Sequence, residues 1–129
     1  MTPSQGLISA GSMFEGAHVC ESAWSDFLYD LVSSHARYMA EHQKQGHQYF
    51  EQRFLIVRKE LGLKATEICA ESWEWQTILP YDQLGTEMFS CWSMSKGHWK
   101  VASTKHKYWA GDMCMGKNGI WYACILVAD

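Results

Sequence analysis

The clearest structural signal is the stretch YWAGDMCM-GKNG-IWYACILV, residues 108–127. Its Asn118-Gly119 pair favours the positive backbone angles of a tight hairpin turn, so the flanking apolar stretches are predicted to pair as antiparallel strands. The second of these stretches, residues 120–127, is almost wholly apolar, which is typical of a strand covered on both faces. We therefore predict a hairpin whose returning strand is central in a sheet.

Two helices are predicted ahead of this hairpin. Residues 22–45 repeat apolar side chains at i, i+3, i+4 and i+7, with Ser22 or Ser25 as the cap and Gly46 after the end. His35 lies on the apolar stripe and is interpreted as a core histidine bonded to backbone or water. A second helix is predicted over residues 49–61 with Gly62 as its stop, and its charged residues are expected on a solvated side: Arg53, Arg58, Lys59 and Glu60.

The middle of the chain predicts a strand and a third helix. Residues 66–79 are rich in β-formers, and Trp73 and Trp75 alternate with polar residues as in a half-buried strand. A helix is predicted from about Thr86 to Ser95, followed by a turn in which Gly97 aims His98 away from the helix. The order of helix, helix, strand, helix and hairpin predicts an α+β fold in which helices pack on an antiparallel sheet.

Residues 1–21 are interpreted as an extended or irregular N-terminal arm, because glycines recur among small residues at Gly6, Gly11 and Gly16. The arm also carries apolar side chains, which we expect to dock against another protein chain: Leu7, Ile8, Met13 and Phe14.

Composition limits the classes of function. A length of 129 residues predicts one folded unit. The net charge of −3 and the lack of a Lys/Arg cluster argue against a nucleic-acid partner, and the lack of an apolar run of about 18 residues argues against a membrane span. No secretory signal is recognised at the N-terminus, so synthesis in the cytoplasm is expected. The five cysteines have no zinc-ribbon spacing and are interpreted as small buried thiols.

Four segments resemble, in order, the motifs of the CAP superfamily (cysteine-rich secretory proteins, antigen 5 and pathogenesis-related proteins), and the bacterial type most of all. They are SHARYMA (34–40), Gly46-His47, Ala70-Glu71-Ser72 and WSMSKGH (92–98). The resemblance implies a CAP-like domain over residues 22–129 with an α-β-α sandwich, an antiparallel sheet flanked by helices. The chain departs from the family pattern at Ser72, where an asparagine is usual, and at Trp99, where Arg or Phe is usual.

The resemblance also implies a surface cleft. His47, Glu71 and His98 would be its ligands for a divalent metal, with zinc or magnesium as the expected ion. Glu87, with Asp82 as the reserve candidate, would add a second carboxylate, and Trp99 would line the cleft. Two imidazoles and one carboxylate suit Zn²⁺ with a fourth position left for water.

These observations favour a non-enzymatic binding or interaction module, with no catalytic residue assigned and an accessory part of a viral (phage) particle as one setting. A metal-dependent hydrolase that uses His47, Glu71 and His98 is one alternative. The other is a carbohydrate or cell-wall binder that uses Trp73 and Trp99, since aromatic faces near polar groups suit a small apolar or glycan ligand.

Overall fold

The computed structural model describes residues 1–73 and 79–129 of the chain. Its elements are, in chain order, α1 (Pro3–Met13), a short 3-10 turn (Val19–Glu21), β1 (Ala23–Trp24), α2 (Asp26–His42), α3 (Phe50–Leu61), β2 (Ala65–Glu71), α4 (Tyr81–Ser93), α5 (Lys96–Ala102), β3 (Tyr108–Met115) and β4 (Trp121–Ala128).

The sheet has the strand order β1-β3-β4-β2, in which β4 is antiparallel to both of its neighbours. The predicted hairpin is confirmed as β3 and β4, with Gly119 at a φ of 82° in the turn. Residues 122–128 are all buried, so the returning strand is central and covered on both faces, as its apolar sequence predicts. The two-residue strand β1 adds a parallel edge beside β3 that was not predicted.

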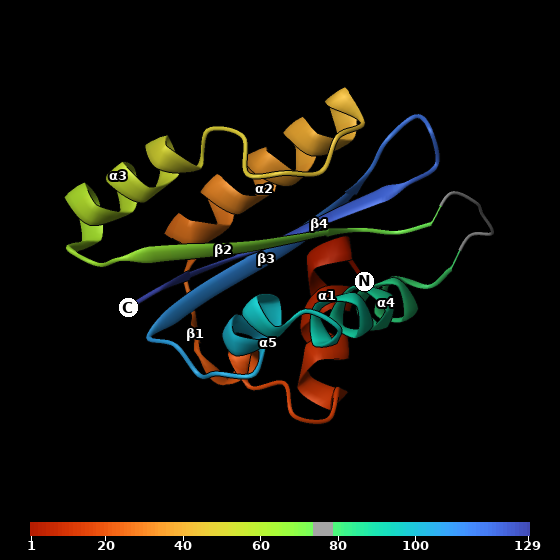
Figure 1. The fold of residues 1–129 in the computed structure, drawn as a ribbon, viewed down its shortest axis with the longest axis horizontal. Coiled ribbons are helices and arrows are strands. Elements are labelled where there is room, and N and C mark those ends of the chain that lie inside the picture. The colour runs from red at the N-terminus through yellow and green to blue at the C-terminus, as the bar shows by residue number, and fades with distance from the viewer. Residues whose placement is uncertain (74–78) are drawn as a thin grey trace.

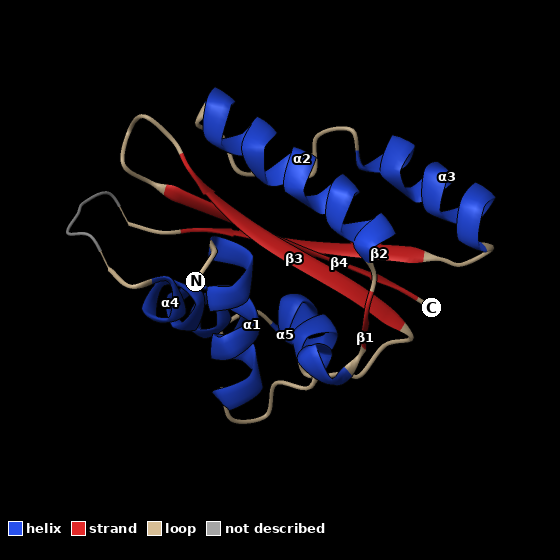
Figure 2. Ribbon diagram, turned by 180° about the vertical axis from the view of Figure 1, so that it is seen from behind, coloured by secondary structure: helices blue, strands red, loops and turns tan. Residues whose placement is uncertain are grey.

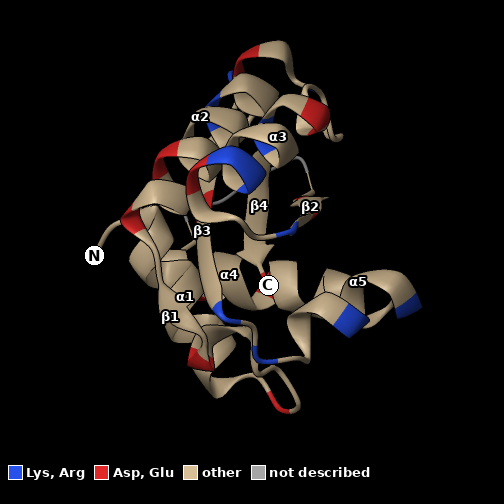
Figure 3. Cartoon of the chain, turned by 90° about the vertical axis from the view of Figure 1, so that its left-hand side faces the viewer, with Lys and Arg blue, Asp and Glu red and all other residues tan. Residues whose placement is uncertain are grey.

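Helices cover both faces of this sheet (Figure 1). Helices α2 and α3 lie over one face, and α1, α4 and α5 lie over the other, as the reverse view also shows (Figure 2). The predicted α+β fold with an antiparallel sheet between helices is therefore confirmed. Charged residues lie mostly on the helices and connections (Figure 3). By sequence, β3 and β4 carry a single charged residue, Asp112.

The N-terminal segment is a helix, so the expectation of an extended or irregular arm is wrong. Thr2 caps α1 through a complete capping box with Gln5, and Pro3 occupies the first helical position, where its missing N–H costs nothing. The glycines serve close packing: a Cβ on Gly6 would lie 2.5 Å from the Tyr81 backbone. Leu7 is fully buried in the chain's own core, which accounts for this apolar group without a second chain.

Helices α2 and α3 follow their predicted positions. Ser25 caps α2 by accepting a hydrogen bond from the Leu28 amide, and Gly62 ends α3 at a φ of 68°. Gly46 does not end α2, because Gln43 takes the left-handed conformation three residues earlier.

The region after β2 differs most from expectation. Strand β2 ends at Glu71, and the Trp75 part of the predicted alternation lies outside the described residues. Helix α4 begins at Tyr81, five residues before the predicted start, directly after Pro80. The Ser95–Gly97 turn is instead the first turn of α5, so Gly97 is helical and does not redirect His98. None of the helices in the described ranges combines the length and apolar character that crossing a bilayer requires.

Candidate functional site

A buried ion pair lies between the sheet and α3. Side chains alternate along β2, so Glu67 and Cys69 both face α2 and α3. The Glu67 carboxylate is 1% exposed and accepts two hydrogen bonds from Arg53, Nε to Oε2 at 2.7 Å and Nη2 to Oε1 at 2.8 Å. This bidentate geometry is the strong form of an Arg–carboxylate pair, and it compensates for the burial of both charges.

Two histidines complete the polar surroundings of Glu67. His47, in the connection between α2 and α3, donates from Nδ1 to Glu67 Oε1 at 3.0 Å. His35, on α2, donates from Nε2 to the Gly46 carbonyl at 2.7 Å, and the same nitrogen lies 3.6 Å from Glu67 Oε1. The interpretation of His35 as a core histidine bonded to backbone is therefore confirmed.

Two thiols lie beside this pair. Cys69 and Cys124 are directly opposite each other on β2 and β4, both are buried, and their sulfur atoms are 3.6 Å apart. Cys69 Sγ is also 3.7 Å from Glu67 Oε1. Register and alternation thus bring two sulfur atoms against the carboxylate.

The cluster shifts the ionisation of its members. Burial would raise the pKa of Glu67, but hydrogen bonds from His47 and Arg53 outweigh it and lower that pKa. Contacts with Cys69 and then with Glu67 raise the pKa of His47 to about 10. The hydrogen bond with Cys124 lowers the pKa of Cys69 against the effect of burial, whereas burial raises the pKa of Cys124.

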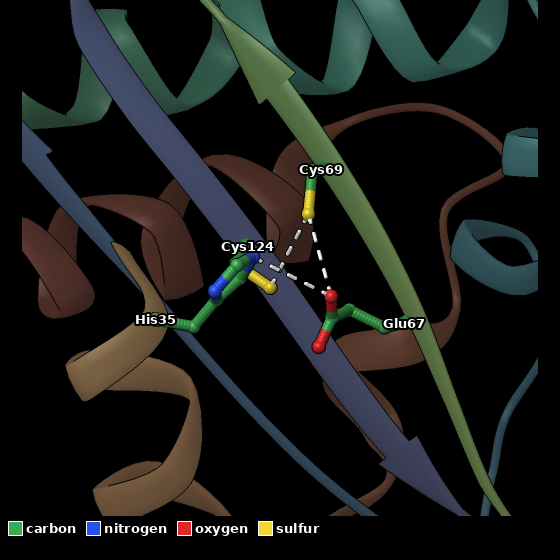
Figure 4. Close-up of side chains that lie close together, drawn as sticks. All are labelled: His35, Glu67, Cys69 and Cys124. Carbon is green, nitrogen blue, oxygen red and sulfur yellow. Dashed lines mark hydrogen bonds and ion pairs between the residues drawn. The ribbon is translucent and has the colours of Figure 1, made fainter. Parts of the chain in front are cut away.

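Four ligand atoms in this cluster form a group that could hold a metal ion (Figure 4). They are His35 Nε2, a Glu67 oxygen, and the sulfur atoms of Cys69 and Cys124, all within 4.8 Å of one another and all from buried residues. This nitrogen, oxygen and sulfur set resembles that of zinc sites in proteins.

The structure keeps the three expected metal ligands apart. His47 lies on the α2 and α3 side of the sheet, at Glu67. His98 is on α5, which lies over the opposite face, and Glu71 is an exposed residue at the end of β2. In the described part of the chain, His47, Glu71 and His98 do not form a group of close ligand atoms. These residues therefore do not fit a shared ion.

The two other expected cleft residues also lie elsewhere. Glu87 is an exposed residue of α4. Trp99, on α5, is partly buried and packs edge-on against Phe14, with 5.9 Å between ring centroids. Trp99 thus contributes to the core beneath α1.

Sequence reasoning missed the centre of the cluster. Arg53 was expected on the solvated side of its helix, which is wrong, since it is 7% exposed. Its spacing was the available signal: Arg53 follows Phe50 by three residues and precedes Val57 by four, which places it on the buried face. Glu67 and Cys69 share one face by the period of two, a signal that could have indicated a polar group on that side of the strand.

A groove opens beside the cluster, between α2 and α3. It has a volume of about 270 Å³. Tyr38 and Tyr49 meet edge-on at 5.5 Å between ring centroids within its lining. The remaining lining residues come from one stripe on each helix: Leu31, Ser34 and His35 from α2, and Gln52, Arg53 and Ile56 from α3. His35 and Arg53 therefore belong to both the groove and the buried cluster.

Comparisons with known proteins show the fold alone. The chain is similar in structure to an outer surface protein from Borrelia burgdorferi, with a TM-score of 0.72 and 16% sequence identity, over 100% of this chain and 96% of that one. No family model matches the sequence, and no curated protein matches it.

Proposed function

We propose that this chain is a non-enzymatic binding module whose ligand site is the groove between α2 and α3. The observation that carries the proposal is the lining of this groove, in which apolar and aromatic side chains surround a few polar groups. Small-molecule sites commonly have this composition.

The expected ligand is a small amphipathic molecule. Its apolar part would contact Leu31, Ile56 and the tyrosine pair, and its polar or anionic end would face His35 and Arg53. Tyr49 and Ile56 are 59% and 41% exposed, so a ligand would remove apolar surface from water.

A binding role is also favoured by the state of the ionisable groups. The Glu67 carboxylate is buried and hydrogen-bonded to Arg53 and His47, so it is not presented to a substrate. The hydrolase alternative depends on His47, Glu71 and His98, which lie apart, and the carbohydrate alternative depends on Trp99, which packs against Phe14. We therefore place the binding module ahead of both alternatives.

Membership of the CAP superfamily remains a prediction, supported by the order of the four sequence motifs and by the helix-sheet-helix layers. Incorporation into a viral particle and display on a cell surface are two settings that we propose for such a module; the structural neighbour is an outer surface protein. As cofactor we propose zinc over magnesium, because thiolate sulfur and imidazole nitrogen suit Zn²⁺ whereas Mg²⁺ takes oxygen ligands.

The groove is tested with two neighbouring residues of α3. Ile56 lines the groove, whereas Leu55 is 56% exposed outside it. A library of aromatic and aliphatic acids is screened by chemical-shift changes in amide NMR spectra. We expect hits to shift groove residues, and Ile56→Glu to weaken binding about 10-fold through loss of an apolar contact.

Leu55→Glu is the matched control and should leave the affinity within about twofold. Equal losses in both variants, or hits that map to the opposite face of the sheet, would remove the groove as the ligand site.

A further inference from the structure

The paired thiols lie on neighbouring strands in the sheet. Cys124 is on the central strand β4 and Cys69 is its direct partner on β2, so the sheet register fixes both Cα positions. Both sulfur atoms point to the α2 and α3 face, where His35 of α2 approaches them. Ligands held by rigid elements keep their geometry when an ion binds.

Three of the six distances among the ligand atoms match the edges of a tetrahedral zinc site. Bonds of about 2.0–2.3 Å from Zn²⁺ to nitrogen, oxygen and sulfur give tetrahedron edges of about 3.3–3.8 Å. Three of the six edges fall in this range: 3.6 Å from Cys69 Sγ to Cys124 Sγ, 3.7 Å from Cys69 Sγ to Glu67 Oε1, and 3.6 Å from His35 Nε2 to Glu67 Oε1. The other three are no longer than 4.8 Å. Small side-chain movements would therefore complete the site.

Charge also balances in such a site. Without metal, the charges of Glu67 and Arg53 cancel in the buried cluster. A bound Zn²⁺ takes the place of two protons of the cluster, one from Cys124 and one shared by Cys69 and His47, whose Sγ and Nδ1 atoms are 3.8 Å apart. Its two positive charges are then matched by two thiolates, while Glu67 and Arg53 still cancel. The ion thus adds no net charge to a buried position, where an unbalanced charge is costly.

We propose that His35, Glu67, Cys69 and Cys124 bind one Zn²⁺ as a four-coordinate structural site, with Arg53 as the outer partner of the Glu67 carboxylate. Two protons pass to solvent, one from Cys124 and one from the Cys69–His47 pair, and two Zn–S bonds form. His35 exchanges its Nε2 proton for one on Nδ1, so that Nε2 can coordinate. Because all four positions are taken by protein, the ion has no open site for substrate.

The hydrogen bonds of both histidines, and those of the Cys69 thiol, would have to yield to the ion. His35 Nε2 would leave the Gly46 carbonyl, and His47, whose side chain is 47% exposed, would leave Glu67 Oε1 and turn toward solvent. Arg53 can stay on Glu67 Oε2, at 2.7 Å. Since His35 lines the groove, the groove supplies the entry path. This inference rests on the proposed choice of zinc and not on groove binding.

The test uses the full chain, freed of metal by a chelator and kept reduced with a phosphine. Zinc is titrated in competition with a chromophoric chelator. We expect one ion per chain, at least about 100-fold weaker binding in Cys69→Ala and in Cys124→Ala, and unchanged binding in Cys20→Ala and Cys114→Ala. The controls remove cysteines that lie outside the group.

The absorption spectrum of bound Co²⁺ reports on its ligands directly, so it separates loss of a ligand from loss of folding. Co²⁺ in the site should show the intense visible bands of tetrahedral coordination and a thiolate charge-transfer band in the near ultraviolet, which Cys124→Ala would reduce. Circular dichroism establishes that each variant folds, and His35→Gln provides a further ligand variant if a cysteine variant does not.

Several results would overturn the site: no stoichiometric zinc binding by the reduced chain, binding that survives loss of both cysteines, or a cobalt spectrum without thiolate bands. Binding of Mg²⁺ in place of Zn²⁺ would overturn the choice of metal as well. Since Ile56→Glu probes the groove separately, failure of the metal site would leave the groove result unaffected.

Discussion

The cores on the two faces of the sheet differ in composition and in how closely the backbones approach. Under α1 and α4 the core is apolar and backbones approach closely, because glycines on both helices leave room: a Cβ on Gly85 would lie 2.8 Å from the Gly6 carbonyl oxygen. Under α2 and α3 the core contains a buried ion pair, the buried His35 and two thiols, with a groove beside them. The first face is packed by apolar side chains and close backbones, and the second holds the polar cluster and the groove.

The largest loss of stability is expected when one partner of the buried Arg53–Glu67 ion pair is removed. Arg53→Met leaves the Glu67 carboxylate buried without its cation, and we expect a loss of about 3–5 kcal/mol in the free energy of unfolding, measured with urea. Adding Glu67→Gln should restore much of that loss, because the unpaired charge is removed. A double variant no more stable than Arg53→Met would mean that Arg53 acts through packing alone.

The close packing of α1 against α4 is tested by Gly6→Ala, which adds one methyl group. Gly6→Ala would place its Cβ 2.5 Å from Tyr81 backbone and Cβ atoms, so we expect it to destabilise the protein by about 1–3 kcal/mol through overpacking. Gly97→Ala in α5 meets open space and should stabilise by about 0.5–1 kcal/mol. Thermal and urea unfolding measure both; equal effects would deny that α1 and α4 need glycine for their close approach.

The smallest expected effect is the pH dependence. Glu67 is surrounded by Arg53, His35, His47 and the two thiols, and its pKa lies below the ordinary value of 4.5. A lowered folded-state pKa means that its stabilisation is complete above about pH 4.5 and is lost as pH falls through the folded value.

Urea unfolding at a series of pH values measures this acid loss. Glu67→Gln should flatten the acid side of the stability curve, whereas Glu71→Gln, which changes an exposed carboxylate on the same strand, should not. If Glu67→Gln lost as much stability at low pH as the unmodified chain, groups other than Glu67 would be responsible for that loss.

Elements set by local patterns could be predicted from the sequence, whereas contacts between distant segments could not. The hairpin, the central position of β4 and the span of α3 follow from local patterns in residues 49–62 and 108–127, and the structure confirms them. The capping box of Thr2 and Gln5 is an equally local signal for helix α1. The glycines of this segment argued against a helix, because their role in packing against α4 depends on a contact that is distant in sequence.

The cluster could not be predicted in the same way. Glu67 is on β2, Arg53 on α3 and Cys124 on β4, and only the sheet register and the helix position bring them together. The expected trio of His47, Glu71 and His98 was drawn from motif order, which carries no information about which face of the sheet each residue reaches. One member, His47, does reach the cluster, through Glu67.

The strand order has a consequence for how the protein can form during its synthesis. β4 pairs with both β2 and β3 yet follows every other element in the chain, and β1 pairs with β3 although most of the chain separates the two. At roughly 5–20 residues per second, β1 is synthesised about 5–20 s before β4 is complete. During that interval α1 has no strand to cover. The nascent chain would thus expose apolar segments from both layers at once, and formation of the sheet would wait for β4 and be sensitive to chaperones.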